Sequence, residues 1–159
     1  MAKPVLVAVD SEEGSRQALA GELEARYGVH YRIISSTSPE TALAALGRLR
    51  GERADVPLVM ADQWMPGTAG AQFFARVREL FPTARRAALI PMGDPSAWGT
   101  AAALSNVDFC LVRPMSSPAE QFHRAVTESL EEWWRQRGGR FEAVTVEFLS
   151  GVKCFGWWS

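Results

Sequence analysis

The sequence predicts an α/β domain in which a doubly wound, five-stranded parallel sheet carries helices on both faces. Short apolar runs alternate along the chain with stretches whose apolar residues recur every three or four positions, which is the pattern of βα units. These runs are mostly apolar on both sides, as strands covered by two helical layers must be. The five runs are residues 5–9, 31–34, 58–61, 87–90 and 109–112.

Helix starts are marked by an oxygen acceptor followed by proline, as in Ser38-Pro39, and this pair recurs at 94–95 and 117–118. Proline suits the first helical position because it has no N–H to leave unpaired. Ser117 and Glu120 form a capping box at the last helix, which we expect to end at residues 138–139. Apolar stripes are expected at Leu19, Leu23 and Tyr27, at Phe73, Phe74, Val77, Leu80 and Phe81, and at Phe122, Val126, Leu130, Trp133 and Trp134.

Composition points to a globular protein without a nucleic-acid or membrane role. The chain of 159 residues is 47% hydrophobic with a net charge of −1, which argues against bulk nucleic-acid binding. Cys110 and Cys154 form no CxxC pair, so neither a zinc site nor a disulfide is predicted. The first apolar run is too short for a signal peptide or a membrane span, and we expect a cytoplasmic protein. One domain, 1–138, is followed by an extension, 139–159.

Charged residues gather at the predicted carboxyl ends of the strands, where doubly wound sheets bind their ligands. Asp10 follows the first strand, Asp62 the third and Arg113 the fifth. If the strand order is 2-1-3-4-5, the two acids are neighbours, and Mg²⁺ would relieve their repulsion. Arg113 would pair with Asp62 or with a phosphoryl group placed on it. The three residues together describe a site that forms an aspartyl phosphate.

Residues 62–67, which read D-Q-W-M-P-G, resemble the D-x-x-M-P-G segment of response-regulator receiver domains (CheY-like). Arg113-Pro114 falls where that family has lysine-proline, and the resemblance covers residues 4–137. It implies a flavodoxin-like fold, Asp62 as the phosphoacceptor, a cis bond before Pro114 and a histidine kinase as phosphodonor. It also implies that the backbone carbonyl of Trp64 completes the metal ligands of Asp10 and Asp62. The family's role is signalling, so no enzyme activity of its own is expected.

Within that family, the chain is most similar to the receiver half of proteins that join a receiver to a thioredoxin-reductase-like flavoprotein. Residues 79–82, 84–86 and 141–142 carry this likeness. The reductase half is missing, because the sequence contains neither a GxGxxG segment after a strand nor a CxxC pair. The chain is therefore expected to be either a piece of such a fusion protein or a freestanding relative, and residues 139–159 either an extension of the domain or a linker to a missing one.

The metal site departs from the family pattern. Receivers usually carry two adjacent acids after the first strand, and here the second position is Ser11. A hydroxyl in place of a carboxylate should weaken Mg²⁺ binding. Glu12 would compensate only if its side chain turned back from the start of the first helix.

The switch positions depart as well. Ile90 occupies the position of a threonine or serine whose hydroxyl bonds the phosphoryl group, and isoleucine cannot donate. Losing one charge-assisted hydrogen bond removes roughly 1.5–3 kcal/mol, which is as large as a typical coupling energy. Cys110 replaces the aromatic residue that swings inward on activation, and Arg113 replaces lysine. We therefore hypothesise that Asp62 is phosphorylated poorly or not at all. The alternative is that it is phosphorylated in the ordinary way.

Two other functions fit the sequence less well. A haloacid-dehalogenase-type phosphatase would use Asp10 as its nucleophile but would need late paired acids, and an FMN binder would need a Ser, Thr and Gly phosphate loop after the first strand. The serious alternative is a phosphorylation-independent interaction or ligand-sensing module on the same scaffold. Its partners would be a histidine kinase or another signalling protein, or a second copy through the fourth helix, fifth strand and fifth helix. His30 and His123 are expected to be structural or exposed.

Overall fold

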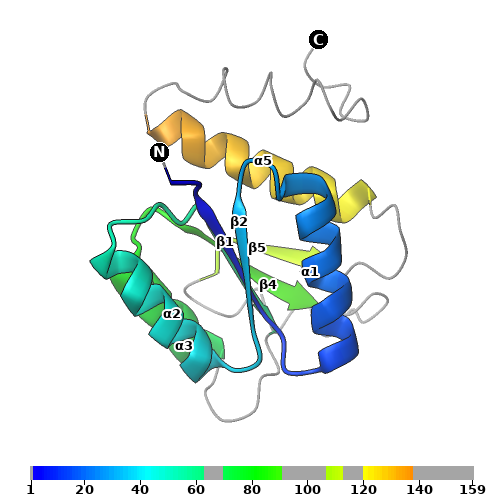
Figure 1. Cartoon of the computed structure of the whole chain (residues 1–159), viewed down its shortest axis with the longest axis horizontal. Helices are drawn as coiled ribbons and strands as arrows, with labels where there is room; N and C mark the ends of the chain where they lie inside the picture. The colour runs from blue at the N-terminus through cyan, green and yellow to red at the C-terminus, as the bar shows by residue number, and fades with distance from the viewer. Residues whose placement is uncertain (1, 63–69, 91–106, 113–119, 138–159) are drawn as a thin grey trace.

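The computed structural model describes residues 2–62, 70–90, 107–112 and 120–137, and shows a five-stranded parallel sheet with helices on both faces (Figure 1). The strand order is β2-β1-β3-β4-β5, so the predicted doubly wound topology is confirmed. The strands are β1 (Val5–Val9), β2 (Arg32–Ser36), β3 (Leu58–Asp62), β4 (Arg85–Ile90) and β5 (Phe109–Val112). The helices are α1 (Glu13–Tyr27), α2 (Pro39–Gly51), α3 (Gly70–Leu80) and α5 (Glu120–Gln136).

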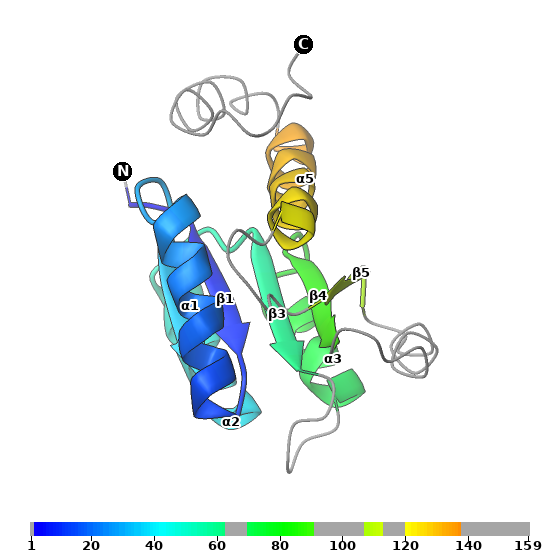
Figure 2. The same cartoon turned by 90° about the vertical axis from the view of Figure 1, so that its right-hand side faces the viewer.

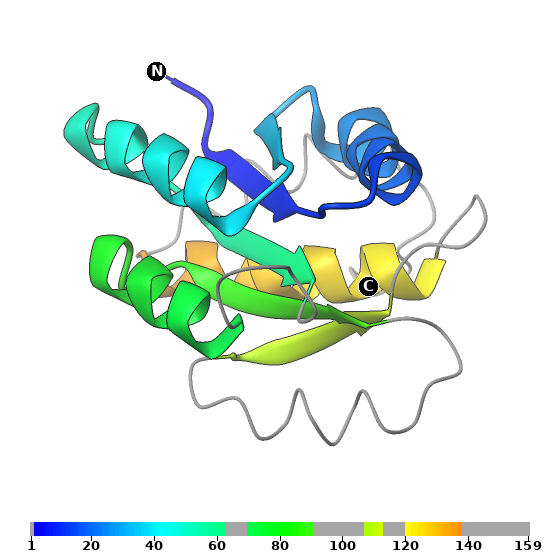
Figure 3. The ribbon, with the colours of Figure 1, turned by 90° about the horizontal axis from the view of Figure 1, so that it is seen from below.

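The helices divide into two pairs, one on each face of the sheet. Helices α1 and α5 cover one face, whereas α2 and α3 lie side by side on the other (Figures 2 and 3). Successive residues of a strand point to opposite faces, so β1 serves both cores. Leu6 and Ala8 join the core beneath α1 and α5, while Val5, Val7 and Val9 join the core beneath α2 and α3. This two-sided burial explains why the run contains no polar residue.

Two strands differ from their predicted ranges. Strand β2 covers residues 32–36 rather than 31–34, and as an edge strand it is only partly buried. Strand β4 begins two residues early, at Arg85 and Arg86. Polar residues are tolerated there because the guanidinium of Arg86 donates two hydrogen bonds, of 3.1 and 3.2 Å, to the carboxylate of Asp108. Apolar patterning locates a strand's centre, but such polar pairs extend it at the rim of the sheet.

The predicted cap of the second helix is present. Ser38 is the N-cap residue of α2, its hydroxyl accepts a hydrogen bond from the Thr41 N–H at 3.1 Å, and Pro39 opens the helix. Arg53, two residues after the end of α2, has the left-handed conformation, at φ 58°, where glycine is the usual residue. The Arg53 N–H donates to the Arg50 carbonyl and the Ala54 N–H to the Leu49 carbonyl, which is a Schellman motif.

The predicted apolar stripes are buried as expected, with Leu80, Phe81 and Trp134 only partly covered. Helix α5 ends at Gln136, two residues before the predicted stop. Among the helices of the described ranges, none combines the length and apolarity needed to cross a lipid bilayer. The caps at residues 94 and 117, the predicted fourth helix, and the extension 139–159 lie outside the described residues.

Candidate functional site

Sheet register brings the two predicted acids to the same edge on adjacent strands. Strands β1 and β3 pair directly, with Val9 opposite Ala61, so Asp10 and Asp62 follow the last paired positions. Asp62 is itself opposite Leu89 of β4. The arrowheads of β1, β3 and β4 meet at one edge of the sheet (Figure 2). The strand order on which the predicted site depends is therefore present.

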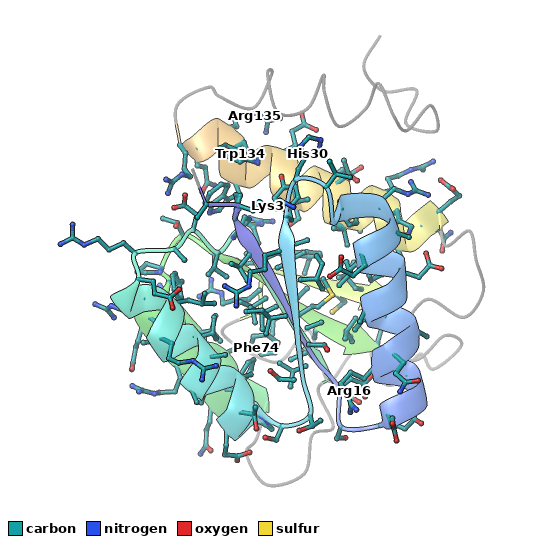
Figure 4. All side chains as sticks on the ribbon, viewed as in Figure 1. Lys3, Arg16, His30, Phe74, Trp134 and Arg135 are labelled. Carbon is teal, nitrogen blue, oxygen red and sulfur yellow. The ribbon has the colours of Figure 1, made fainter. Side chains whose placement is uncertain are left out.

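The carboxylate of Asp10 is buried and bound by its own chain. Asp10 is fully buried, its Oδ1 accepts a hydrogen bond from the Glu12 N–H at 3.0 Å, and its Oδ2 accepts one from the Ser15 hydroxyl at 2.6 Å. The Arg16 guanidinium donates to the Asp10 carbonyl at 3.3 Å. Figure 4 shows Arg16 near the start of α1, at the opposite end of the domain from Lys3 and Trp134. The donors to Asp10 thus come from the first turn of α1.

Glu12 is directed at the helix rather than at the strand edge. It is the N-cap residue of α1, and its carboxylate accepts hydrogen bonds from the Gly14 N–H at 3.1 Å and the Ser15 N–H at 2.6 Å. A carboxylate at this position also interacts favourably with the positive end of the helix dipole. Ser11, between the two acids, is exposed. The compensation expected of Glu12 would require it to leave these two N–H groups.

The two switch positions that the structure describes lie in or beside the core. Ile90 ends β4 and is fully buried in the same cluster as Val9 and Ala61. Cys110 is partly buried against this cluster, and burial raises the pKa of its thiol. A raised thiol pKa leaves the neutral, weakly nucleophilic form at neutral pH. Neither side chain offers the hydrogen-bond donor or the ring that the family pattern places there.

The predicted site extends beyond the described residues. Trp64, Arg113 and Pro114 lie outside the described residues, so the third charged group of the predicted constellation stays a prediction. Asp62 is partly exposed at the end of β3. Within residues 2–62, 70–90, 107–112 and 120–137, no three His, Cys, Asp or Glu side chains are grouped to hold a metal ion.

Sequence reasoning missed Ser15 and Arg16, which both contact Asp10. The available signal was their position in the first turn of the helix that follows the acid. Only three residues separate the end of β1 from the start of α1, so the first turn of the helix lies near the strand end and its polar side chains can reach the residue there. The two histidines, by contrast, lie away from this edge, as expected: His30 is partly buried and His123 is buried between α1 and α5.

Comparison with known proteins identifies the fold. No protein-family model and no curated protein matches the chain, but many solved structures do. An uncharacterized protein from Neptuniibacter caesariensis is 26% identical, with a TM-score of 0.68 over 88% of this chain and 98% of that one. The signal receiver domain of an HD domain-containing protein from Pseudomonas fluorescens is 22% identical, with a TM-score of 0.66 over 84% and 99%. The chemotaxis response regulator CheY4 of Vibrio cholerae is 19% identical, with a TM-score of 0.61 over 80% and 99%. The chain therefore has the fold of CheY-like receiver domains.

Proposed function

We propose that this chain is a receiver domain of a two-component phosphorelay with a degenerate switch, in which Asp62 holds the phosphoacceptor position but accepts a phosphoryl group poorly or not at all. The fold and the adjacency of Asp10 and Asp62 support the receiver role. The domain then signals through contacts with other proteins, such as a histidine kinase or another signalling protein. A phosphorylation-independent pseudo-receiver is the limiting case of this proposal.

The observation that carries the proposal is the set of hydrogen bonds around Asp10. Receivers hold Mg²⁺ with strand-end acids, but both carboxylate oxygens of Asp10 already accept hydrogen bonds from Glu12 and Ser15. Ser11 is neutral and Glu12 caps α1. The described residues of this loop therefore offer a divalent cation a single strand-end carboxylate whose oxygens are shared with two hydrogen-bond donors, which is a poor ligand set for a hard cation that needs several oxygens.

The end of β4 supports the same conclusion. A phosphoryl oxygen needs donors around it, and the side chain of Ile90 presents only carbon to the buried end of the strand. Its neighbours in the core, Val9 and Ala61, add none. A phosphoryl group on Asp62 would therefore lack the bond that draws the following loop toward it.

Intact-mass measurement tests the proposal. The purified protein is incubated with Mg²⁺ and acetyl phosphate, and we expect no stoichiometric phosphate adduct. The matched control is the Ser11→Asp, Ile90→Thr double variant, which restores both missing groups and is expected to gain an adduct. An adduct on the natural chain that is lost in Asp62→Asn would overturn the degenerate switch and establish ordinary phosphorylation.

The interaction surface is also part of the proposal. Trp133 is fully buried and Trp134 donates its indole N–H to the Tyr31 hydroxyl at 2.8 Å, so these two aromatics belong to the fold. Phe109 is partly buried beside β4. A homodimer formed through the fourth helix, β5 and α5 would therefore depend on other side chains of that face. Sedimentation velocity of the whole chain would measure whether the dimer forms.

A further inference from the structure

A cavity of about 170 Å³ lies where the middle of α5 covers the first residues of β4 and β5. It is lined by Arg85, Phe109, Ala125, Glu128 and Ser129. Because Arg85 and Phe109 begin their strands whereas Asp62 ends β3, the cavity lies at the opposite edge of the sheet from the acids. In Figure 4, the labels of Trp134 and Arg135 on α5 mark this end of the domain, and Arg16 marks the other.

Two of the lining residues carry a buried hydrogen-bond donor that has no partner among the described residues. Ser129 is only 4% exposed, and its hydroxyl finds no hydrogen-bond partner in that part of the chain. The same holds for the buried Nε of Arg85. Folded proteins pair almost all such groups, because leaving one unpaired is destabilising. The Arg85 Nε–H can only donate and the Ser129 hydroxyl can also donate, so one acceptor group can satisfy both, and a carboxylate offers two acceptor oxygens.

Arg85 contrasts with its neighbour Arg86. The guanidinium of Arg86 makes a bidentate pair with Asp108, whereas Arg85 makes no salt bridge within the described part of the chain. Instead the guanidinium of Arg85 lies over the Phe109 ring, with its carbon 5.6 Å from the ring centroid. A guanidinium held on an aromatic face keeps its edge donors directed at other groups. The Gln136 hydrogen bond lowers the pKa of Glu132 on α5, and the charge of Arg85 adds to this, but without an ion pair between Arg85 and Glu132. Arg85 is therefore a positioned cation that an oxyanion in the cavity could reach.

The other lining groups restrict the ligand further. Phe109 and Ala125 provide apolar surface, and the exposed carboxylate of Glu128 adds a negative charge to the rim. Glu128 disfavours a simple anion and favours a molecule that also carries a cation. The cavity is smaller than the pockets of roughly 300–1,000 Å³ that hold drug-sized ligands.

We propose that this cavity binds a small zwitterion, an α-amino acid with a short apolar side chain. Its carboxylate accepts hydrogen bonds from Arg85 Nε–H and the Ser129 hydroxyl, and its ammonium faces Glu128. Its side chain lies against Phe109 and Ala125. This site is independent of Asp62, so it stands whether or not that residue is phosphorylated.

Amide chemical-shift titration of the ¹⁵N-labelled full chain with L-valine tests the proposal. We expect saturable shifts centred on residues 85, 109, 125 and 129. Isovalerate, which lacks the ammonium, and isobutylamine, which lacks the carboxylate, should each bind at least about tenfold more weakly, since each loses a charge-assisted interaction. Equal binding of valine and isovalerate would overturn the zwitterion assignment, and absence of saturable shifts at millimolar valine would overturn the site.

Variants separate the site from general surface binding. Ser129→Ala and Arg85→Gln should each weaken valine binding by about tenfold or more. Arg86→Gln is the matched control, because Arg86 does not line the cavity and its Nε and Nη2 pair with Asp108, and it should leave the affinity unchanged. Ser129→Ala should fold at least as stably as the natural chain, because alanine favours helix and removes an unpaired hydroxyl. Unchanged affinity in both Ser129→Ala and Arg85→Gln would overturn the proposal.

Discussion

A buried hydrogen-bond network joins α1 to α5 through His123. The Nε2 of His123 lies 2.8 Å from the Glu22 carboxylate, and its Nδ1 lies 3.2 Å from the Tyr27 hydroxyl. A neutral ring with its hydrogen on Nε2 satisfies both contacts, because Nε2–H donates to Glu22 and the Tyr27 hydroxyl donates to Nδ1. The Thr127 hydroxyl donates to the His123 carbonyl at 2.7 Å. The network predicts that His123 supports the packing of α5 on α1.

Replacing His123 by phenylalanine measures this support. The ring contacts with Phe122 and Tyr27, at centroid distances of 5.2 and 5.5 Å, are kept in kind. Tyr27 can turn its proton to the carbonyl of residue 123, 3.1 Å away, so the main loss is the donor to the partly exposed Glu22 carboxylate. A hydrogen bond to a charged group contributes roughly 1.5–3 kcal/mol, and we expect a destabilisation of about 2 kcal/mol. Urea unfolding followed by circular dichroism measures it.

The same residue predicts how stability depends on pH. Burial lowers the pKa of His123, and the Glu22 hydrogen bond opposes this; Arg26 lowers it further, while the charges of Glu22 and Glu120 raise it. The unfolded chain then binds more protons than the folded one below the ordinary histidine pKa of about 6.5, so stability is full above that value and falls as the pH drops toward the folded pKa.

The His123→Phe variant should lack this part of the pH dependence, and Glu22→Gln, which keeps an acceptor for Nε2–H, should cost less than His123→Phe. Urea midpoints measured between about pH 8 and pH 5 make the comparison. If the variant and the natural chain lose stability in parallel over that interval, or if His123→Phe costs nothing, the reasoning is refuted.

Four further changes have defined outcomes. Arg53→Gly should raise the free energy of unfolding by about 0.5–1 kcal/mol, because φ 58° strains a residue with a Cβ; a lower melting temperature would contradict this. Burial raises the pKa of Tyr31 to about 12 and the Trp134 hydrogen bond opposes this, so Trp134→Phe should raise it further in an ultraviolet pH titration, and a fall would refute the contact. Ser11→Asp should tighten Mg²⁺ binding by about tenfold or more in calorimetry, and no change would argue against the metal-site reading. Ile90→Thr should lower the free energy of unfolding by about 1–3 kcal/mol in urea, because a buried methyl is lost and a hydroxyl is buried; an unchanged midpoint would count against a core role.

The fold was predictable because the apolar patterning of the strands and the capping residues of the helices both agree with it. The first apolar run fits a central strand covered on both faces, and Ser38-Pro39 fits the start of α2. The sequence offered no direct sign of which residues pair between strands. The predicted strand order alone placed Asp10 and Asp62 at the ends of neighbouring strands. Edge strand β2 was shifted by one to two residues because its half-exposed side chains give a weaker pattern.

The details of the acidic loop were not predictable from sequence. Asp10, Ser11, Glu12 and Ser15 all carry oxygens that can cap a helix, and N-cap statistics favour serine and aspartate over glutamate. In the structure Glu12 caps the helix, and the Ser15 hydroxyl donates a hydrogen bond to the Asp10 carboxylate. The choice depends on how the chain leaves β1, which is a property of three-dimensional packing. The unpaired donors of Arg85 and Ser129 were hidden for the same reason, because they are 44 residues apart in sequence.

The hydrogen bonds that start α1 compete directly with cation binding. Glu12 either caps the helix or turns toward the strand edge, and giving up a cap costs about 1 kcal/mol. Releasing Asp10 Oδ2 from the Ser15 hydroxyl removes a charged hydrogen bond of about 2 kcal/mol. A cation that needed both carboxylates would have to offset the loss of these two interactions, about 3 kcal/mol in all. Its affinity would be lower by roughly a hundredfold. Because both bonds also hold the first turn of α1, the weak cation binding that we propose would follow from the way this chain begins its first helix as well as from Ser11.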